Sequence, residues 1–389
     1  MLYQGGERLL SAINAKGQFV QLAGQHIHEL IHQKKHESYF CPQCKAPVLI
    51  RAGSKVVPHF AHFPNSDCPS SRSGEGIYHH KGKVRLWEWL KSQGYDVALE
   101  AYLPEIQQRP DVLLHTKKRR IAIEYQCAKI PDSEISMRTK QYLQVGIYPF
   151  WILGGNRLKR KGTNMIQLTS FDRNFIYHFL DYRIHYFDPI TDKLMIGSHL
   201  QGTGSNKTFS NLHYFSLNGI SFIEMFSSQN LLLNDMPAGW KSFIKKRRTR
   251  PLGHCSPQEK SWREYLYAKG YHPSLLPSIT YLPVPSQIQM VEPPWIWQSR
   301  YYLDTFLKTP IGGLLPIKPA QIIVPLLHVH KKPNPLKEYL KLLCLLGLVE
   351  EVLPGEYRKR QEVENPLTIE EAIKQDEFVF NSLQKRVKP

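Results

Sequence analysis

Three polar side chains, Asp111, Glu124 and Gln126, lie in two apolar stretches that are typical of neighbouring β-strands. The basic turn 116–120 joins the two stretches. Strands of a hairpin lie about 5 Å apart and residues i and i+2 share a face, so Asp111 can reach the face that carries Glu124 and Gln126. Mg²⁺ and Mn²⁺ prefer carboxylate oxygens, and a metal held this way can polarise a phosphodiester and activate water. The pattern therefore predicts a Mg²⁺ or Mn²⁺ site at Asp111 and Glu124.

The spacing of these residues resembles the PD-(D/E)xK nuclease signature, with glutamine at the usual lysine position. Pro110 precedes Asp111, Glu124 follows thirteen residues later, and Gln126 is the next residue but one. Lysine at that position offsets negative charge in the transition state, whereas a neutral amide can only hydrogen-bond. Lys83 is a candidate for the missing cation, and without it the site would bind DNA and metal without efficient cleavage. The alternative interpretation of the two strands alone is an ordinary hairpin with solvent-facing acids.

Apolar periodicity predicts the elements that must position these residues. We expect two helices and four strands in the order α-β-β-β-α-β, at 77–92, 96–102, 111–115, 121–126, 132–145 and 148–153. This order is the core of the restriction-endonuclease-like fold, an α/β architecture in which the acids lie at one end of the central strands. The predicted fold class is therefore α/β, with a nuclease-like domain over residues 73–158.

Both predicted helices carry polar residues that could reach the acids. His79 and Lys83 share the face of the first helix that becomes apolar further along, so its polar start could line a cleft. Arg138 and Tyr142 lie one turn apart on the second helix and could place a guanidinium and a phenol beside a phosphate. The alternatives are an exposed, frayed helix start for the first pair, and a buried tyrosine with a surface arginine for the second.

Five candidate zinc ligands lie close together before the predicted nuclease-like domain. Cys41 and Cys44 form a CxxC knuckle whose thiolates can share one tetrahedral Zn²⁺, and Cys68 supplies a third sulfur. His62 is the preferred fourth ligand, and the choice between it and His59 is nearly even. Four protein ligands leave no open coordination position, so this zinc would be structural rather than catalytic.

Composition excludes several classes of protein. The chain has 389 residues, 42% of them hydrophobic and 11% aromatic, which suits two or three packed domains rather than a disordered chain. Its formal net charge of +18 favours a polyanionic partner, nucleic acid first, with anionic lipid or a solvated basic surface as alternatives. No signal peptide is recognisable, and apolar runs such as 342–349 are far shorter than the ~20 residues that span a bilayer. We expect a cytoplasmic protein without a transmembrane segment.

Changes in the sequence pattern divide the chain into four parts. These are a β-rich zinc ribbon at 1–72, the nuclease-like domain at 73–158, a basic and aromatic region that is partly β at 159–250, and a mostly helical C-terminal region at 251–389. Hairpins are expected at 7–22 and 183–198, and a short strand at 48–51. Helices are expected at 261–269 and 336–352. The aromatic side chains are interpreted mainly as core, with stacking on unpaired bases as the alternative.

The densest basic cluster lies at 241–250 and offers four candidates for DNA contact: Lys245, Lys246, Arg247 and Arg248. Such a cluster could track the phosphates of a nucleic acid as a basic arm. The alternative is a solvated linker between domains.

Several motifs, over about residues 1–155, occur in an order that resembles the competence protein CoiA family of Gram-positive bacteria. They are Tyr39-Phe40-Cys41-Pro42-x-Cys44, His59-Phe60-Ala61-His62, Glu75 with His79 and Lys83, Leu99-Glu100, Pro104-Glu105-Ile106-Gln107-Gln108-x-x-Asp111-Val112, Glu124-Tyr125-Gln126-Cys127 and Arg138-x-x-x-Tyr142. The resemblance implies a cytoplasmic protein of natural transformation that acts on incoming single-stranded DNA at or before RecA-mediated recombination.

Carried onto this sequence, the resemblance also implies roles for individual residues. Asp111 and Glu124 would ligate the metal, and Gln126 would take the place of the usual lysine. Four further residues would complete the pocket: Glu75, His79, Lys83 and Glu100. Gly76 stands where the family often has serine, which leaves the geometry of that turn open.

Two functions from different classes fit this sequence. The first is a metal-dependent nuclease that processes DNA during transformation, favoured by the acids that converge on one pocket. The second is a non-catalytic DNA-binding mediator that hands single strands to RecA or another recombination protein, favoured by Gln126 and the basic charge. Salt-sensitive DNA binding would not separate them, because both functions require it.

Overall fold

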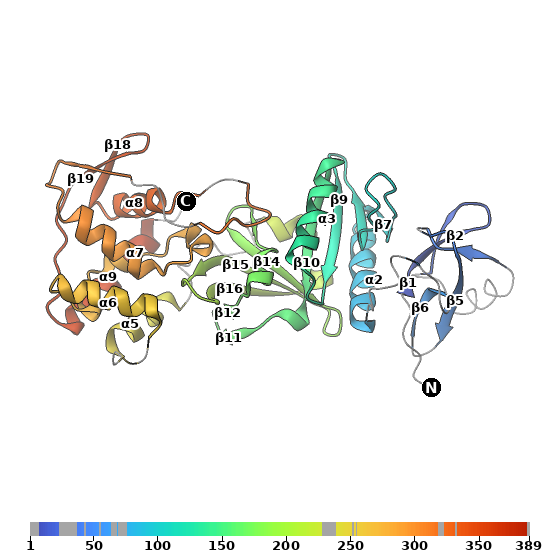
Figure 1. Cartoon of the computed structure of the whole chain (residues 1–389), viewed down its shortest axis with the longest axis horizontal. Coiled ribbons are helices and arrows are strands. Elements are labelled where there is room, and N and C mark those ends of the chain that lie inside the picture. Colours follow the sequence, from blue (N-terminus) through green and yellow to red (C-terminus); the bar gives the residue numbers. More distant parts are fainter. Residues whose placement is uncertain are drawn as a thin grey trace. The chain divides into compact units, whose positions relative to one another are not determined.

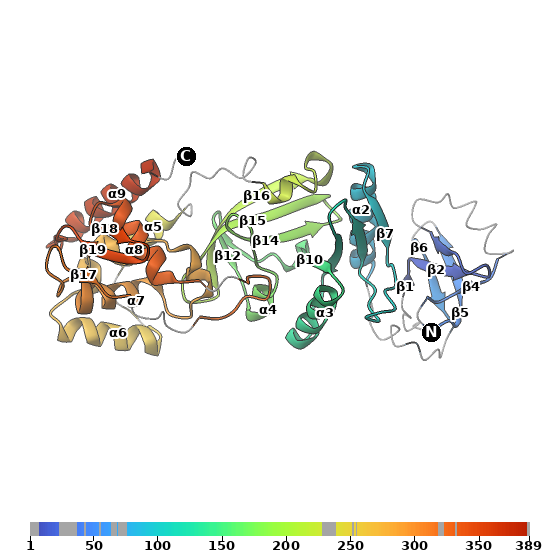
Figure 2. The same ribbon diagram turned by 90° about the horizontal axis from the view of Figure 1, so that it is seen from above.

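A computed structural model of the chain describes residues 8–22, 37–42, 44–53, 56–63, 68, 76–227, 239–250, 253, 255–317, 323–330 and 333–386. Backbone contacts divide the chain into two compact units. Unit 1 consists of Met1–Leu158, His185–Met195 and Tyr214–Met225, and unit 2 of Lys159–Ile184, Ile196–His213 and Phe226–Pro389. Figures 1 and 2 show the elements of both units. None of the described helices is both long enough and apolar enough to cross a bilayer.

Unit 1 begins with a six-stranded sheet in the order β1-β6-β5-β4-β2-β3. Its strands are β1 Arg8–Leu9, β2 Ser11–Asn14, β3 Phe19–Gln21, β4 Tyr39–Phe40, β5 Pro47–Gly53 and β6 Val56–His62. The hairpin expected at 7–22 is confirmed by the antiparallel pair β2 and β3. The short strand expected at 48–51 is confirmed as part of β5. The side chains of Leu9, Ile50 and Phe60 are almost fully buried and form the core of this sheet.

The predicted α-β-β-β-α-β order is confirmed in the next part of unit 1. Its elements are α2 Ile77–Ser92, β7 Asp96–Leu99, β8 Val112–His115, β9 Arg120–Gln126, α3 Asp132–Gln144 and β10 Ile147–Gly154. Strands β7, β8 and β9 are antiparallel neighbours, and β10 runs parallel to β9. Gly94 has φ +79° and ends α2 as expected, because glycine adopts this left-handed conformation without steric cost.

Helices α2 and α3 cover opposite faces of this sheet (Figure 1). Successive strand residues point to opposite faces, and Glu124 and Tyr125 are successive residues of β9. The Glu124 carboxylate accepts hydrogen bonds from Arg138 and Tyr142 of α3. The Tyr125 ring stacks on His79 of α2. Strand β9 is therefore the element that separates the two helices and carries side chains toward both.

Gly82 lets α2 approach β9 closely. A Cβ atom built on Gly82 would lie 1.9 Å from Cε1 of Tyr125. Gly82→Ala is expected to lower the free energy of unfolding by about 1–3 kcal/mol, because the Tyr125 ring or the helix must shift. Gly76→Ala is the matched control, since a Cβ there meets nothing within 4 Å. Thermal unfolding of the two variants compares them directly, and equal melting temperatures would contradict the close approach.

Three strands contribute residues to both units: β14 Tyr182–Asp188, β15 Lys193–Gly202 and β16 Lys207–Ser216. They confirm the hairpin expected at 183–198, and β14 pairs in parallel with the end of β10. Within unit 1 the tip of this hairpin is bound to α2. The Arg85 guanidinium lies 2.8 Å from a carboxylate oxygen of Asp192, and the Tyr78 hydroxyl donates to Asp188.

Unit 2 carries most of the helices, and the mostly helical C-terminal region is confirmed. The α-helices are α4 Ser170–Arg173, α5 Trp240–Thr249, α6 Pro257–Ala268, α7 Pro294–Tyr301, α8 Pro335–Leu345 and α9 Ile369–Arg386, and a π-helix, η8 Tyr302–Phe306, follows α7. The remaining strands are β11 Arg160–Gly162, β12 Met165–Gln167, β13 Tyr177–His178, β17 Leu314–Leu315, β18 Val349–Leu353 and β19 Glu356–Lys359. Short 3₁₀ helices occur in both units. Those with residues in unit 1 are η2 Gly155–Arg157, η3 Leu217–Gly219 and η4 Glu224–Phe226, whose last residue belongs to unit 2; those of unit 2 are η5 Pro273–Leu275, η6 Ser278–Tyr281 and η7 Pro285–Gln289.

Two expectations about the C-terminal half were wrong. The helix expected at 336–352 ends at Leu345, because Gly347 adopts φ +79° and β18 follows. The basic cluster at 241–250 is not a solvated linker. It forms α5, whose face of Trp240, Ile244 and Arg248 is buried.

Candidate active site and metal centre

Asp111 lies immediately before β8 and is held by groups from α2 and β9. Its Oδ1 lies 3.4 Å from the Lys83 ammonium, and its Oδ2 lies 3.5 Å from Nε2 of His79. The main-chain N–H of Tyr125 donates to the same Oδ2 at 2.8 Å. The side chain is 11% exposed. The structure therefore brings together three residues that the sequence predicted for one pocket: Lys83, His79 and Asp111.

Glu100 is the second acid that contacts Lys83. Its Oε1 lies 2.6 Å from the Lys83 ammonium, and both side chains are only 1% exposed. Its Oε2 accepts a hydrogen bond of 2.8 Å from the main-chain N–H of Leu10 and lies 3.7 Å from the Arg109 guanidinium. Sequence reasoning missed Leu10 and Arg109. A main-chain donor leaves no signal in a sequence, whereas Arg109 directly precedes Pro110-Asp111 and could have been considered.

Glu124 faces α3 rather than α2. Its Oε1 accepts hydrogen bonds from the Arg138 guanidinium and the Tyr142 hydroxyl. Burial raises the pKa of Glu124 to about 7; the Arg138 charge opposes this shift and the Asp111 charge adds to it. Tyr142 is completely buried, so it supports Glu124 and its ring is not a surface contact for DNA. Arg138 and Tyr142 were proposed to lie beside a phosphate; in the structure both bind the Glu124 carboxylate.

His79 and Gln126 occupy different surroundings. The His79 ring stacks on Tyr125 with centroids 5.6 Å apart, and its Nε2 lies 2.6 Å from the Tyr125 carbonyl oxygen. The Gln126 side-chain amide donates to the carbonyl oxygen of Ala128 at 2.7 Å, within its own loop. Glu75 lies outside the described residues. The structure thus gives the neutral amide of Gln126 a local partner and puts a cation, Lys83, beside Asp111.

The donor chemistry of Asp111 and Glu124 fits a hard divalent cation. The register of β8 and β9 pairs Val112 with Ile123, and continuing it by one residue places Asp111 opposite Glu124. Two carboxylates that repel each other in a buried site are stabilised by a cation between them. Neither acid belongs to a described group in which three or more metal-binding side chains converge. A metal at this pair would therefore take its other ligands from water or substrate phosphate, as Mg²⁺ commonly does.

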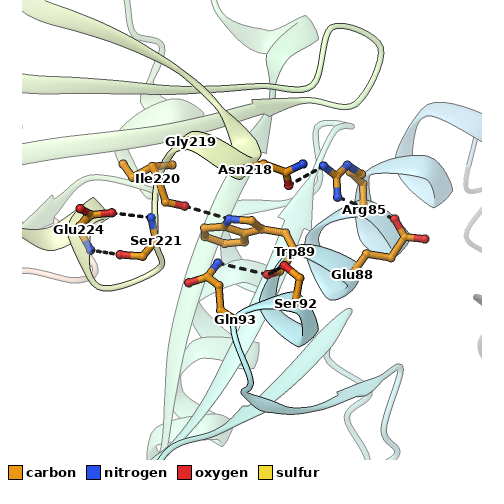
Figure 3. A pocket seen from close by; sticks show the side chains of 10 residues that line it. All are labelled: Arg85, Glu88, Trp89, Ser92, Gln93, Asn218, Gly219, Ile220, Ser221 and Glu224. Atoms are coloured by element: carbon orange, nitrogen blue, oxygen red, sulfur yellow. Dashed lines mark hydrogen bonds and ion pairs between the residues drawn. The ribbon is translucent and has the colours of Figure 1, made fainter.

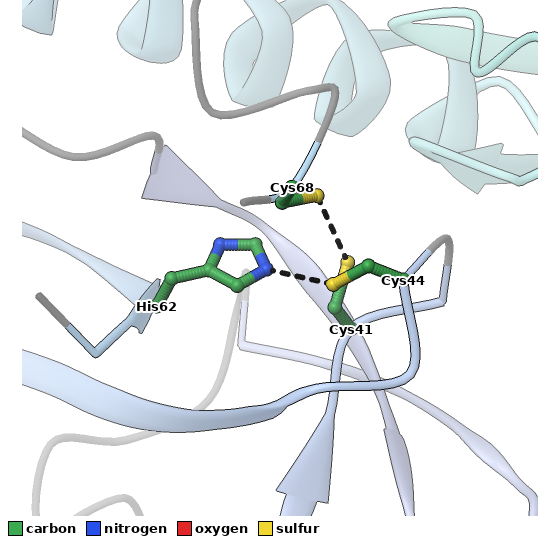
Figure 4. A group of neighbouring side chains, drawn as sticks. All are labelled: Cys41, Cys44, His62 and Cys68. Carbon is green, nitrogen blue, oxygen red and sulfur yellow. Dashed lines mark hydrogen bonds between the residues drawn. The ribbon is translucent and has the colours of Figure 1, made fainter. Parts of the chain in front are cut away.

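Four side chains of the N-terminal sheet form a cluster that can hold a metal such as zinc (Figure 4). The three cysteine sulfurs and one nitrogen of His62 all lie within 4.8 Å of one another: Cys41, Cys44, His62 and Cys68. The structure thus selects His62 over His59 for this group. Burial, and to a smaller extent the Arg109 charge, lower the pKa of His62, which favours the neutral imidazole that metals require. Three sulfurs and one nitrogen fit the tetrahedral coordination of a structural zinc.

The cluster predicts a metal content of one zinc ion per chain. Cys44→Ser is expected to reduce this to near zero, because the remaining three ligands bind zinc far more weakly. His59→Ala is the matched control and is expected to keep one ion. Elemental analysis of the purified full chain gives both numbers. Loss of zinc from His59→Ala and its retention in His62→Ala would reverse the assignment.

The four basic residues proposed for DNA contact differ strongly in exposure. Lys245 and Lys246 are exposed on α5. The Arg247 guanidinium lies 2.8 Å from the Glu259 carboxylate and 3.8 Å from the ring centroid of Trp295. Arg248 is 1% exposed and forms a buried ion pair with Asp376, with N–O distances of 2.6 and 2.8 Å. The structure therefore does not support a DNA contact by Arg248, whose charge is committed to the core of unit 2.

A hollow of about 500 Å³ lies in unit 1 (Figure 3). It is lined by α2 and by the segment around η3 and η4. Its polar groups mostly bind one another: the Arg85 guanidinium donates to Asn218, the Trp89 indole N–H donates to the Ile220 carbonyl, and Ser221 binds Glu224. These contacts fix α2 against that segment, and no predicted site residue lines the hollow.

Comparisons with known proteins agree with the resemblance that the motifs carry. Family models of competence protein CoiA match residues 22–71 as the N-terminal domain, 75–230 as the nuclease-like domain and 236–373 as the C-terminal domain. A relative from Bacillus subtilis (strain 168), described as competence protein CoiA, is 29% identical over 362 residues, which cover 89% of this chain and 96% of that protein. No solved structure matches the chain significantly. These matches show that the chain belongs to the competence protein CoiA family.

Proposed function

We propose that this chain acts in natural transformation as a divalent-metal-dependent deoxyribonuclease on incoming single-stranded or recombining DNA in the cytoplasm. The observation that carries the proposal is the pairing of Asp111 with Glu124 at the end of β8 and β9. The β8–β9 register places the two acids opposite each other, and the Asp111 charge helps to raise the pKa of Glu124. Both observations support a shared cation. The match to a nuclease-like domain and the description of the relative support the substrate and the biological role.

Each residue of the pocket has a distinct role in this proposal. Asp111 and Glu124 hold Mg²⁺ or Mn²⁺, which when bound would polarise the scissile phosphate and activate water. Lys83 replaces the cation that Gln126 cannot provide and offsets negative charge beside Asp111. Arg138 holds the Glu124 carboxylate in place by a direct ion pair. These contacts keep the pocket organised before DNA arrives.

The other proposed ligands follow from charge and from the cysteine cluster. A net charge of +18 favours a polyanion, and the exposed residues Lys245 and Lys246 are proposed to contact phosphates. Zinc at Cys41, Cys44, His62 and Cys68 is proposed to be structural. RecA or another recombination protein is the proposed partner at the step where strands are exchanged.

A non-catalytic mediator that assists RecA loading is the second candidate, and a specific observation favours it. Both acids are already paired with protein cations, Asp111 with Lys83 and Glu124 with Arg138. The Gln126 amide is also bound to its own loop. A nuclease fold whose acids are neutralised in this way could bind DNA without cutting it.

Incubation of the purified chain with labelled single- and double-stranded DNA tests the two candidates. Samples with Mg²⁺, with Mn²⁺ and with a chelator are compared, and DNA binding is measured on the same preparations. Cleavage in either metal that stops with the chelator supports the nuclease. Tight binding without cleavage in both metals would overturn it and favour the mediator. A preparation with one zinc ion per chain is used throughout, so that loss of the zinc ribbon does not imitate loss of activity.

A further inference from the structure

We propose that Glu100 is a positioning residue through which the N-terminal module, the sheet β1–β6, holds Lys83 in place beside Asp111. This inference rests on the proposed nuclease, because it assigns to the module the control of that same pocket. The module therefore does more than support the fold: removing the Leu10 main-chain donor is expected to release the Lys83 side chain on α2.

Glu100 connects the two parts of unit 1 with its two carboxylate oxygens. One oxygen lies 2.6 Å from the Lys83 ammonium. The other accepts the main-chain N–H of Leu10, which follows β1. Lys83 in turn lies 3.4 Å from Asp111. A chain of charged and hydrogen-bonded groups thus runs from the N-terminal module through Glu100 to the acid of the pocket.

Further contacts hold the backbone around Glu100 against the module. The Ser11 hydroxyl donates to the Glu100 carbonyl oxygen at 3.2 Å, and the Gln21 side-chain amide donates to the Leu99 carbonyl oxygen at 3.1 Å. Leu10, Ser11 and Glu100 are each no more than 1% exposed. Water therefore cannot easily replace these donors, and losing one leaves a buried acceptor unsatisfied.

The backbone of Glu100 is strained in a way that needs outside support. Its φ of +50° lies in the left-handed region, which is sterically unfavourable for a residue with a side chain. Such conformations persist where surrounding contacts over-determine them, often beside functional sites. Here the supporting contacts come from the Asp111 carbonyl, which lies just before β8 and accepts the Glu100 N–H, and from the N-terminal module.

The consequence concerns the position of the Lys83 ammonium. Without a fixed Glu100, the ammonium loses its shortest ion pair and is free to leave the buried space next to Asp111. The pocket would then keep both of its proposed metal-binding acids but lose the cation that Gln126 does not supply. Integrity of the N-terminal module, including its bound zinc, would therefore control the pocket.

Labelling of lysine amines on the full chain tests this inference independently of DNA cleavage. An amine-reactive acetyl ester is added for a short pulse, and peptide mass spectrometry measures modification of Lys83. Glu100→Gln is expected to raise the labelling rate of Lys83 about tenfold or more, because an ion pair and a hydrogen bond to a charged group are lost. Glu105→Gln is the matched control on the same loop, since Glu105 is exposed and is expected to change nothing.

A second pair of variants isolates the main-chain donor. Leu10→Pro and Leu10→Ala both lose the leucine side chain, but only proline lacks the N–H that binds Glu100. Lys83 labelling is expected to be faster in Leu10→Pro than in Leu10→Ala, and removal of zinc by a chelator is expected to act in the same direction. Lys359 of unit 2 is an internal reference, because it is fully buried and reports unfolding of that unit.

The outcomes separate this inference from the nuclease. Faster Lys83 labelling in Glu100→Gln and Leu10→Pro, with Lys359 still protected, supports the positioning role even if no cleavage is found in any metal. Unchanged Lys83 labelling in both variants overturns it, even if the chain proves to be an active nuclease. Where cleavage is measurable, Glu100→Gln is expected to lower kcat while the KM for DNA stays the same.

Discussion

Asp111→Asn and Glu124→Gln are each expected to lower metal-dependent DNA cleavage by at least about 10²–10³-fold, which is the loss typical of removing one electrostatic stabiliser of a transition state. Each substitution keeps the shape of the side chain and removes only its charge. The two acids lie opposite each other by register, so either change removes half of the proposed carboxylate pair. Initial cleavage rates in Mg²⁺ and Mn²⁺ provide the measurement.

DNA binding by these variants is expected to be retained or slightly tighter. Removing a carboxylate from a pocket that receives phosphate lowers the repulsion between protein and DNA. Glu105→Gln is a suitable control, because it removes an exposed acid from the preceding loop without touching the pocket. Wild-type cleavage rates in both Asp111→Asn and Glu124→Gln would place the chemistry elsewhere and contradict the proposed site.

The order of elements around this pocket could be predicted because local patterns determine it. Helix α2 has buried residues at Lys83, Leu86, Trp87 and Leu90, in the helical spacing seen in the sequence. The central strands are short apolar runs separated by turns. The fold of the nuclease-like core was therefore accessible from one sequence. The domain boundaries at 72, 158 and 250 stay predictions, since backbone contacts group the chain differently, with parts of β14, β15 and β16 in unit 1.

The contacts inside the pocket were only partly accessible. The sequence placed Lys83, His79, Asp111 and Glu124 in one site, and the structure brings the first three together. It did not indicate that Glu124 faces α3 while the Asp111 contacts come from α2. Asp111 lies just before β8, where its side chain reaches His79 and Lys83 of α2, although its register partner Glu124 contacts α3. The Leu10 N–H, a main-chain donor ninety residues from Glu100, depends entirely on tertiary packing.

The sequence contained signals against both wrong predictions for unit 2, the helix at 336–352 and the linker at 241–250. Gly347 could have marked the end of α8, because a glycine after the last helical turn commonly adopts the left-handed conformation. In the basic cluster, Trp240, Ile244 and Arg248 recur every four residues and indicate one face of a helix. The high density of basic residues masks this apolar spacing in the sequence. Charge density alone does not distinguish a solvated cation from one that is buried in an ion pair.

Arg248→Ala is expected to lower the free energy of unfolding by about 3–5 kcal/mol, because it leaves the buried Asp376 carboxylate without its cation. The guanidinium also donates to the main-chain carbonyls of Ser274 and Leu276, at 2.7 and 2.9 Å. These acceptors lie in the core of unit 2 and would lose their donor together. Urea unfolding followed by tryptophan fluorescence measures the change, since Trp240 and Trp262 are fully buried in the same unit.

Lys245→Ala is the matched control, three positions earlier on α5. Lys245 is exposed, so its replacement is expected to change stability by no more than about 0.5 kcal/mol. It is expected instead to weaken DNA binding uniformly and to reduce the salt dependence by about one counterion. The opposite result, a stable Arg248→Ala that binds DNA poorly, would restore Arg248 as a contact with the phosphates. The pair of variants thus separates the two roles that one basic cluster combines: a buried arginine that holds α9 to α5, and exposed lysines that are available to a polyanion.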